Sequence, residues 1–244
     1  MENSIILFGA NSAIAKAYIA HLEKVDSTAN VITVSRTNVA LTSSTLTLQH
    51  FTSDYSTSSL ANITETLVNQ QTTAKQIIIF NGVLHANQQM PEKKLEELDP
   101  IYFETLLRSN SLTPLLCVKA MLPILNHHQA CVITALSARV GSIEDNQLGG
   151  WYSYRASKAA LNMLFKTTAI ELARRAKLTR LVLFHPGTTD TELSKPFQKN
   201  VPKDKLFSPE FVAKQLYNLL LHPENLTEIG QVAYLDWQGK PITW

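Results

Sequence analysis

The chain has 244 residues, of which 45% are hydrophobic and 17% are charged, and its formal net charge is +2. This composition is typical of a globular domain with a large core, and the small charge without a basic stripe argues against a nucleic-acid partner. Cys117 and Cys131 build no disulfide framework, and neither they nor His127 and His128 have the spacing of a metal site. The sequence shows no signal peptide and no apolar run of roughly 20 residues that spans a membrane, so we expect a cytoplasmic protein.

Seven short apolar runs alternate with longer amphipathic stretches, which is the pattern of strands separated by helices. Strands are expected at 4–8, 31–35, 46–51, 76–80, 130–136, 180–184 and 231–235. The first helix is expected from a cap at Asn11 or Ser12 to about residue 24, and the second ends at about residue 69. A long helix is expected over 100–125, where Pro114 can introduce a kink. Two more are expected, one from a cap at Ser153 to about residue 175 and one over 209–222. The segment 91–98 is expected as a loop or short helix, and 185–205 as a long loop.

Continuously apolar strands separated by helices are typical of a parallel sheet that is covered on both faces. The sequence therefore predicts one α/β domain over residues 1–244, a doubly wound (Rossmann) fold with a mostly parallel seven-stranded sheet and helices on both faces. In such a sheet, ligands bind beyond the carboxyl ends of the strands, where the strand order reverses. Functional residues are therefore expected at those ends.

Tyr154 and Lys158 lie four residues apart in a stretch that is rich in good helix formers. Side chains at this spacing share one face of a helix, so the phenol and the ammonium are expected side by side. The reference pKa of tyrosine is about 10, and a neighbouring cation lowers it. The pair is therefore suited to general acid–base chemistry if the helix lines a cleft. The alternative is a surface tyrosine stacked on a lysine side chain.

The turn after the first strand has the character of a phosphate-binding turn. Gly9 permits a tight turn, and the small Ala13 and Ala15 let a pyrophosphate and the helix come close. The N-terminus of the following helix offers free N–H groups and a positive dipole to phosphate. Small residues at such a corner are also explained by packing alone.

The second and third strands end in residues that bear on the choice of nucleotide. After the second strand, Arg36 stands where an acidic residue would accept a hydrogen bond from the ribose 2′-hydroxyl of NAD. Arg36 can pair with a 2′-phosphate instead, which favours NADPH, or it is a solvated loop residue. Asp54 follows the third strand, and it either accepts a hydrogen bond from an adenine amino group or caps the next helix.

Taken in order, these motifs resemble the short-chain dehydrogenase/reductase family over essentially the whole chain. The matching segments are Gly9-Ala10-Asn11-Ser12-Ala13-Ile14-Ala15, Asp54, Asn81-Gly82-Val83-Leu84, Asn110, Ser137-Ala138-Arg139-Val140-Gly141, Tyr154-x-x-x-Lys158 and Pro186-Gly187-x-x-x-Thr191. Within the family, the segments 136–143, 149–162 and 236–244 resemble the C-factor and sniffer-type carbonyl reductase branch.

The resemblance implies an NADP(H)-dependent oxidoreductase that reduces an aldehyde or ketone by hydride transfer. Tyr154 is expected to donate a proton to the carbonyl oxygen, while Lys158 holds the nicotinamide ribose and lowers the pKa of Tyr154. Asn110 is expected to hold a water that links Lys158 to solvent. A serine near position 137, assigned as Ser137, is expected to hydrogen-bond the substrate oxygen.

The family also implies a cofactor site that is spread along the chain. Pro186, Gly187 and Thr191 are expected beside the nicotinamide, and the loop 185–205 is expected to close over the substrate. The cofactor is expected to contact Gly9, Asn11, Ser12, Ala13, Ile14, Arg36, Asp54, Asn81, Gly82, Tyr154, Lys158, Pro186, Gly187 and Thr191.

Two segments of the cofactor site depart from the family pattern. Ala13 and Ala15 replace glycines of the phosphate turn, and their methyl groups crowd a pyrophosphate. After the fourth strand, the usual Asn-Asn-Ala-Gly is reduced, so that Asn81 occupies the alanine position before Gly82.

The serine of the active site is also displaced. Counting back from Gly141, the usual serine position falls on Ala138, and Ser137 lies one residue early. On a strand, a shift of one residue turns a side chain to the other face. A turn or bulge would restore Ser137, and Ser142 is the other candidate.

The remaining expectations concern the substrate and the assembly. His85 is either a substrate contact or a solvated loop residue, and Trp151 and Tyr152 either line the pocket or pack the loop. The resemblance implies a homodimer or homotetramer and a small-molecule carbonyl substrate. The alternative function is a catalytically weak nucleotide-binding signalling or sensor protein of the C-factor type.

Overall fold

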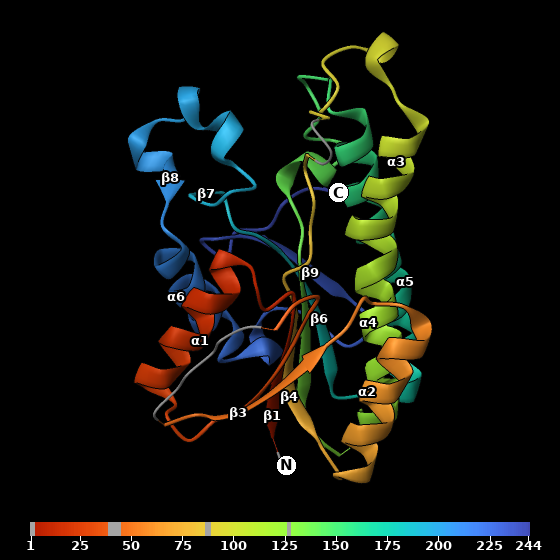
Figure 1. The fold of residues 1–244 in the computed structure, drawn as a ribbon, viewed down its shortest axis with the longest axis vertical. Coiled ribbons are helices and arrows are strands. Elements are labelled where there is room, and N and C mark those ends of the chain that lie inside the picture. Colours follow the sequence, from red (N-terminus) through yellow and green to blue (C-terminus); the bar gives the residue numbers. More distant parts are fainter. Residues whose placement is uncertain (1–2, 39–44, 86–88, 126–127) are drawn as a thin grey trace.

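Seven parallel strands form the sheet, in the order β3-β2-β1-β4-β5-β6-β9 (Figure 1). We describe a computed structural model of the chain, over residues 3–38, 45–85, 89–125 and 128–244. The strands are β1 (Ser4–Phe8), β2 (Asn30–Ser35), β3 (Thr47–Thr52), β4 (Ala74–Ile79), β5 (Cys131–Leu136), β6 (Thr179–His185) and β9 (Val232–Asp236). All seven lie within two residues of the bounds expected from the sequence, and the predicted doubly wound α/β fold is confirmed.

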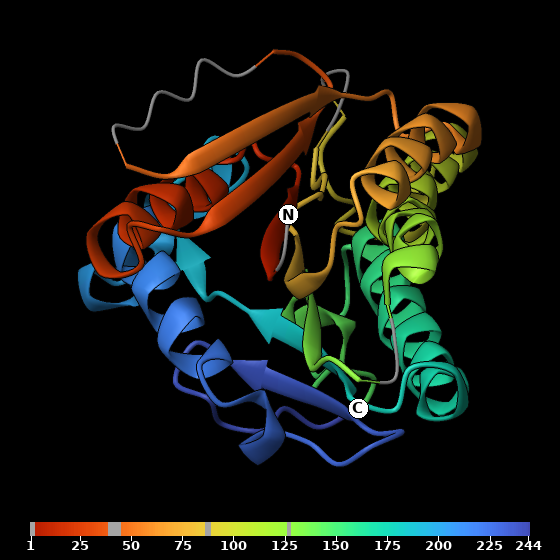
Figure 2. The same cartoon turned by 90° about the horizontal axis from the view of Figure 1, so that it is seen from below.

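Helices cover both faces of this sheet, which explains why its inner strands are apolar without alternation. Helices α1 (Ala13–Val25) and α6 (Pro209–Leu220) lie on one face, and α2 (Thr57–Asn69), α4 (Thr113–Met121) and α5 (Tyr152–Arg175) lie on the other (Figure 2). All five residues of β1 are buried between these two layers. The strand order reverses between β1 and β4, so the expected ligand crevice opens above these two strands.

The long helix expected over residues 100–125 is not one regular helix. It consists of α3 (Pro100–Leu107), a π-helical turn (Arg108–Leu112), α4 and a 3-10 turn (Leu122–Ile124). Pro114 has no N–H to donate to the carbonyl of Asn110, and the widened turn lies directly before it. The irregularity therefore precedes the proline and centres on Asn110.

Most helix starts follow the sequence signals, but α5 does not. The side chain of Ser12 caps α1 by accepting a hydrogen bond from the N–H of Ala15, which decides between the two residues expected there. In contrast, Ser153 lies inside α5, and the residue before that helix is Trp151, whose side chain makes no capping hydrogen bond. The expected cap at Ser153 is therefore wrong.

The segment 185–207 contains two short strands that the sequence did not predict. Strands β7 (Thr188–Thr189) and β8 (Leu206–Phe207) pair in parallel and close the base of the segment between them. In Figure 1 this segment stands above the carboxyl edge of the sheet, opposite the loop that follows β5. Within the described ranges, no helix is long and apolar enough to cross a membrane.

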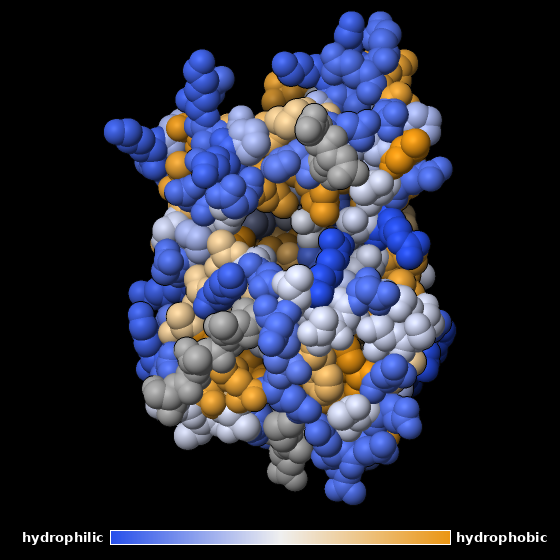
Figure 3. Space-filling model, viewed as in Figure 1, coloured by the Kyte–Doolittle hydropathy of each residue, from blue (hydrophilic) through white to orange (hydrophobic). Residues whose placement is uncertain are grey.

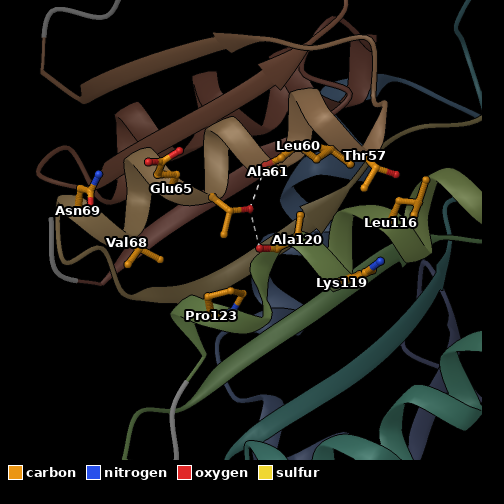
Figure 4. Close-up of a pocket in the computed structure, with 11 residues that line it drawn as sticks. Thr57, Leu60, Ala61, Glu65, Val68, Asn69, Leu116, Lys119, Ala120 and Pro123 are labelled. Carbon is orange, nitrogen blue, oxygen red and sulfur yellow. Dashed lines mark hydrogen bonds between the residues drawn. The ribbon is translucent and has the colours of Figure 1, made fainter.

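Away from the carboxyl edge, an open groove runs along the outer side of α2 and α4 (Figure 4). Leu60, Val68 and Leu116 contribute its apolar walls. The hydroxyl of Thr64 donates to the carbonyl oxygens of Leu60 at 2.9 Å and Ala120 at 2.8 Å, which ties the two helices together. The groove is thus a seam between packed helices.

Candidate active site

Tyr154 and Lys158 occupy one face of α5, and both are buried. The Lys158 Nζ lies 5.8 Å from the centroid of the Tyr154 ring, and the relative exposures of the two residues are 3% and 8%. Nζ donates a hydrogen bond of 2.8 Å to the carbonyl oxygen of Leu136, at the end of β5. The pair therefore faces the carboxyl edge of the sheet, and the alternative of a stacked surface pair is excluded.

Burial sets the protonation of both groups. It raises the pKa of the Tyr154 phenol above its ordinary value, and Tyr102 and Tyr234 add to the rise. Burial also lowers the pKa of Lys158 to about 8. The expected lowering of the pKa of Tyr154 by the Lys158 ammonium is not seen, because burial and the two neighbouring tyrosines all raise this pKa. At neutral pH the phenol keeps its proton and is able to donate it.

Asn110 fixes the loop that faces this pair. Its Oδ1 accepts from the N–H of Val83 at 2.7 Å, and its Nδ2 donates to the Val83 carbonyl at 2.8 Å and to the Ser157 hydroxyl at 3.0 Å. A Cβ on Gly82 would lie 3.7 Å from the Lys158 Nζ and 3.8 Å from the Asn110 Oδ1. The structure therefore brings Gly82, Asn110 and Lys158 together as expected, whereas the water assigned to Asn110 stays a prediction.

Ser137 does not point its hydroxyl at Tyr154. The Ser137 Oγ donates to the Oδ1 of Asn162 at 2.7 Å, one turn beyond Lys158 on α5. Ala138 instead packs in the cluster that contains Tyr154. Ser142 is engaged elsewhere, since its hydroxyl accepts from the N–H of Asp145 at 3.1 Å. The one-residue shift seen in the sequence is thus real, and the structure assigns neither serine to the phenol.

Close contacts hold the loop after β5 against α5. A Cβ on Gly141 would lie 2.8 Å from the Lys158 Cβ, so only glycine allows this approach. The Arg155 guanidinium donates to the carbonyl oxygens of Gly150 at 3.0 Å and Gly149 at 3.3 Å. The loop and the first turn of α5 therefore form one wall of the site.

Aromatic side chains form the wall on the substrate side. The Trp151 ring lies 6.1 Å from the Tyr154 ring and 5.1 Å from the Phe197 ring, measured between centroids. The His85 Nε2 lies 3.3 Å from the carbonyl oxygen of Glu192, which joins the loop after β4 to the segment 185–207. Figure 3 shows a hollow with apolar walls between this segment and the loop after β5. Trp151 thus belongs to the pocket, while Tyr152 is exposed.

The turn after β1 is shaped for close approach. Gly9 has a φ of +75°, and a Cβ there would lie 2.9 Å from the backbone nitrogen of Asn81. The Tyr55 hydroxyl accepts from the N–H of Gly9 at 2.9 Å and donates to the Val34 carbonyl at 3.1 Å. No local pattern marks Tyr55, because its two partners lie after β1 and in β2.

Residues expected around the adenosine half lie along this same edge. The Asn11 amide donates to the Thr37 hydroxyl at 2.8 Å, which links the turns after β1 and β2 beside Arg36. Arg36 is exposed, and it has no ion-pair partner among the residues that the structure describes. Asp54 accepts from the N–H of Ser56 at 2.8 Å, and the hydrogen bonds from Ser56 hold the pKa of Asp54 below its ordinary value.

The first turn of α1 contains both buried and exposed residues. Ile14 and Ala15 are buried in the core beneath the sheet edge, whereas Ala13 is exposed at the helix start. The methyl of Ala15 therefore serves packing, and the methyl of Ala13 faces the side from which a phosphate would approach.

Ser56, and not Asp54, is the N-cap of α2.

Unsatisfied polar atoms at the sheet edge test whether a nicotinamide dinucleotide fits. The Asn81 Oδ1, the His185 Nδ1 and the Thr189 Oγ1 are buried and have no hydrogen-bond partner in the described part of the chain. Buried polar atoms normally find partners, so such a group at the ends of β4 and β6 fits a polar ligand. Gly187, after Pro186, has a φ of +71° and packs against the Phe207 ring, and a Cβ there would lie only 2.7 Å from that ring. The residues present therefore fit the cofactor.

In the described part of the chain, a metal ion has no comparable site. The described residues contain no group of three or more His, Cys, Asp or Glu side chains that could hold one. Of the two histidines considered from the sequence, His127 lies outside the described residues.

Residues 3–202 match the family model described as short chain dehydrogenase. The chain belongs to this family. A 1-hydroxy-2-glutathionyl-2-methyl-3-butene dehydrogenase from Rhodococcus sp. (strain AD45) is 30% identical over 165 residues, which cover 68% of this chain and 69% of that protein. C-signal from Myxococcus xanthus is 33% identical over 136 residues, which cover 55% of this chain and 74% of that protein.

Solved structures share the fold at lower identity. Carbonyl reductase Sniffer of D. melanogaster matches with a TM-score of 0.81 and 19% identity, over 100% of both chains. The NADPH-bound carbonyl reductase from chicken fatty liver matches with a TM-score of 0.78 and 21% identity, also over 100% of both chains. The resemblance to the family is confirmed, C-signal and carbonyl reductase Sniffer are among the proteins that the chain is similar to, and the chain is an oxidoreductase of a family that uses a nicotinamide cofactor.

Burial of the Lys158 ammonium predicts a stability cost. The pKa of Lys158 falls from 10.5 to about 8, so the charged form is buried at pH 7 at a cost of about 3 kcal/mol. We expect Lys158→Met to raise the free energy of unfolding at pH 7 by about 2 kcal/mol, measured by urea denaturation. Because the pKa is lower in the folded chain, the wild type gains stability between about pH 8 and 10.5, and the difference shrinks there.

Lys16→Met, at an exposed position of α1, is the matched control. We expect it to change the free energy of unfolding by less than about 0.5 kcal/mol at every pH. A Lys158→Met variant less stable than the wild type at pH 7 would show that the ammonium is not buried at a cost.

Proposed function

We propose that the protein reduces an aldehyde or ketone to an alcohol with NADPH, with Tyr154 as the general acid. The observation that carries the proposal is the buried phenol of Tyr154, which keeps its proton at neutral pH beside the Lys158 ammonium. The phenol lies against Trp151 in the wall of an apolar hollow. A proton donor placed next to an apolar substrate pocket is what carbonyl reduction requires.

The side chains of this chain divide the work between binding and proton transfer. The nicotinamide supplies the hydride when it is bound. Tyr154 donates its proton to the carbonyl oxygen, and the Lys158 ammonium stabilises the phenolate that remains. Asn110 keeps the loop of Gly82 and Val83 in place against Lys158. Since Ala138, and not Ser137, packs in the cluster that contains Tyr154, the phenol is the donor on which the substrate oxygen depends.

The cofactor would be held by the edge that carries the unsatisfied polar atoms. Gly9 and Ser12 would hold the pyrophosphate at the start of α1, and Asn81 and Lys158 would hold the nicotinamide ribose. Asp54 would accept a hydrogen bond from the adenine amino group. Pro186, Gly187 and Thr191 would border the nicotinamide. A dinucleotide in this place agrees with the strand reversal between β1 and β4.

Arg36 supports NADPH over NADH as the cofactor. Arg36 is exposed directly after β2. No carboxylate stands at this position to accept a hydrogen bond from a ribose hydroxyl. A guanidinium forms two parallel charge-assisted hydrogen bonds with a phosphate. The NADPH that is bound in the chicken carbonyl reductase agrees with this choice.

The rival function is a nucleotide-binding signalling protein with little turnover. The relative named C-signal favours it, as do Ala13 and Ala15 in the phosphate turn. The intact Tyr154, Lys158 and Asn110 favour the enzyme, because binding alone does not need a buried acid. The expected homodimer or homotetramer and the cytoplasmic location stay predictions.

Replacement of Tyr154 by phenylalanine tests the proposed chemistry. We expect Tyr154→Phe to lower kcat/KM for carbonyl reduction by about 10²- to 10⁴-fold, because it removes the general acid and little else. NADPH binding, followed by nucleotide fluorescence, is expected to stay within about twofold. Tyr152→Phe, which removes an exposed hydroxyl two residues away, is the control and is expected to keep full activity.

Two outcomes would decide against this proposal. Full turnover in Tyr154→Phe would remove Tyr154 from the mechanism. Tight NADPH binding by the wild type without turnover across a panel of aldehydes and ketones would favour the signalling protein.

Replacement of Arg36 by alanine tests the choice of cofactor. A charge-assisted hydrogen bond contributes about 1.5–3 kcal/mol, so we expect Arg36→Ala to weaken NADPH binding about 10- to 100-fold. NADH binding is expected to be unchanged, since it has no 2′-phosphate. Arg174→Ala, which removes the same charge from an exposed position near the far end of α5, is the control. Equal losses for NADPH and NADH would refute the role of Arg36.

A further inference from the structure

Helix α5 begins without a cap of its own. Trp151, the residue before it, has φ 54° and ψ 40°, and its side chain makes no capping hydrogen bond. The first N–H groups of a helix have no partner inside the helix and need acceptors from elsewhere. The need is acute here because α5 carries Tyr154 in its first turn and the surroundings are buried.

Glu92 supplies these acceptors from a distant part of the chain. Its carboxylate oxygens lie 3.2 and 3.3 Å from the backbone nitrogen of Ser153, 61 residues away, and accept from it. The Ser153 hydroxyl also donates to this carboxylate, and the Trp151 N–H donates to the Glu92 carbonyl oxygen. Glu92 is only 2% exposed. A buried carboxylate is tolerated when it is fully hydrogen-bonded, and the positive end of a helix dipole favours it.

The chain around Trp151 is bent to make this contact. Gly149, Gly150 and Trp151 all have left-handed backbone, with φ of 66°, 65° and 54°. A Cβ on Gly150 would lie 3.3 Å from the Glu92 carbonyl oxygen, so the two segments touch. For a bulky residue such as Trp151, this backbone is strained and persists only where the surroundings fix it.

The Glu92 carboxylate also lies close to the cluster around the phenol. Burial raises the pKa of Tyr102 to about 12, and the negative charge of Glu92 adds to this rise. Tyr102 packs in the same apolar cluster as Tyr154, and its hydroxyl donates to the carbonyl of Leu84 on the loop after β4. Glu92 is therefore bound to the helix that carries the acid and adjoins the wall that faces it.

We propose that Glu92 is a positioning residue for carbonyl reduction, which holds the first turn of α5 and thereby the phenol of Tyr154. The inference rests on the proposed function. Among the described residues, the Glu92 carboxylate makes no hydrogen bond to the phenol, and it acts through Ser153, the neighbour of Tyr154. Its loss should therefore lower the rate of the chemical step more than the binding of either ligand.

Two substitutions of Glu92 separate geometry from charge. Glu92→Ala removes the acceptors. Glu92→Gln keeps one oxygen to accept from the Ser153 N–H and offers an amide N–H to the Ser153 hydroxyl oxygen. Glu96→Ala, which removes an exposed carboxylate from the same loop, is the matched control. Each full-length variant is compared with the wild type in three measurements: amide hydrogen exchange over residues 151–156, the NADPH dissociation constant, and kcat and KM for a reduced carbonyl compound.

We expect Glu92→Ala to speed exchange in the first turn of α5 at least about tenfold and to lower kcat at least about tenfold. The KM for the carbonyl compound and the NADPH dissociation constant are expected to stay within about twofold. Glu92→Gln is expected to restore most of the protection and most of kcat. Glu96→Ala is expected to match the wild type throughout.

Several results would overturn the proposal. Unchanged exchange or unchanged kcat in Glu92→Ala would remove Glu92 from the positioning of Tyr154, and failure of Glu92→Gln to recover would refute the geometric role. Parallel loss of kcat, NADPH affinity and exchange protection along the whole of α5 would reduce Glu92 to a general structural residue. If the wild type reduces no carbonyl compound, the proposed function fails, while the exchange measurement still decides whether Glu92 holds the first turn.

Discussion

Burial of an ammonium group is unfavourable unless the group is hydrogen-bonded, and the arrangement of the site depends on the hydrogen bond from Lys158 to the Leu136 carbonyl. To make this bond, the loop after β5 has to come within contact of α5, which requires Gly141. On the opposite side, a Cβ on Gly82 would lie in ordinary van der Waals contact with Nζ and with the amide oxygen of Asn110. The same exclusion of water that penalises the ammonium keeps the Tyr154 phenol protonated. Exclusion of water at this place therefore lowers the free energy of unfolding through Lys158, while it keeps the proton on Tyr154.

The helix that faces α5 is irregular where the site needs a polar group. Asn110 lies in the π-helical turn before Pro114, and its amide reaches both the loop of Val83 and the hydroxyl of Ser157. Since a π turn shifts the residues that follow by a fraction of a turn, it combines a packed helix with a polar contact at one position.

The strands and the Tyr154–Lys158 pair could be predicted because their signals are local: apolar runs, and two side chains one helical turn apart. Contacts between distant segments could not be predicted in this way. Tyr55 meets Gly9 across 46 residues, and Glu92 meets Ser153 across 61 residues, so no window of sequence contains both partners. Ser153 looked like a cap for the same reason, because the true acceptor lies in another loop. The direction of Ser137 depended on where β5 ends, which a pattern of alternation does not fix.

The left-handed run of residues 149–151 has a consequence for how the site can change. A right-handed helix cannot grow backward through three residues of the opposite hand, so the register of α5 is locked at its first turn. The loop ahead of it contacts α5 through Gly141 and Arg155 but leaves Ile143 and Leu148 largely exposed. Insertions or exchanges in that loop can reshape the mouth of the pocket while Tyr154 keeps its depth. Under the proposed function, one scaffold can in this way acquire new substrate preferences without rebuilding its proton donor.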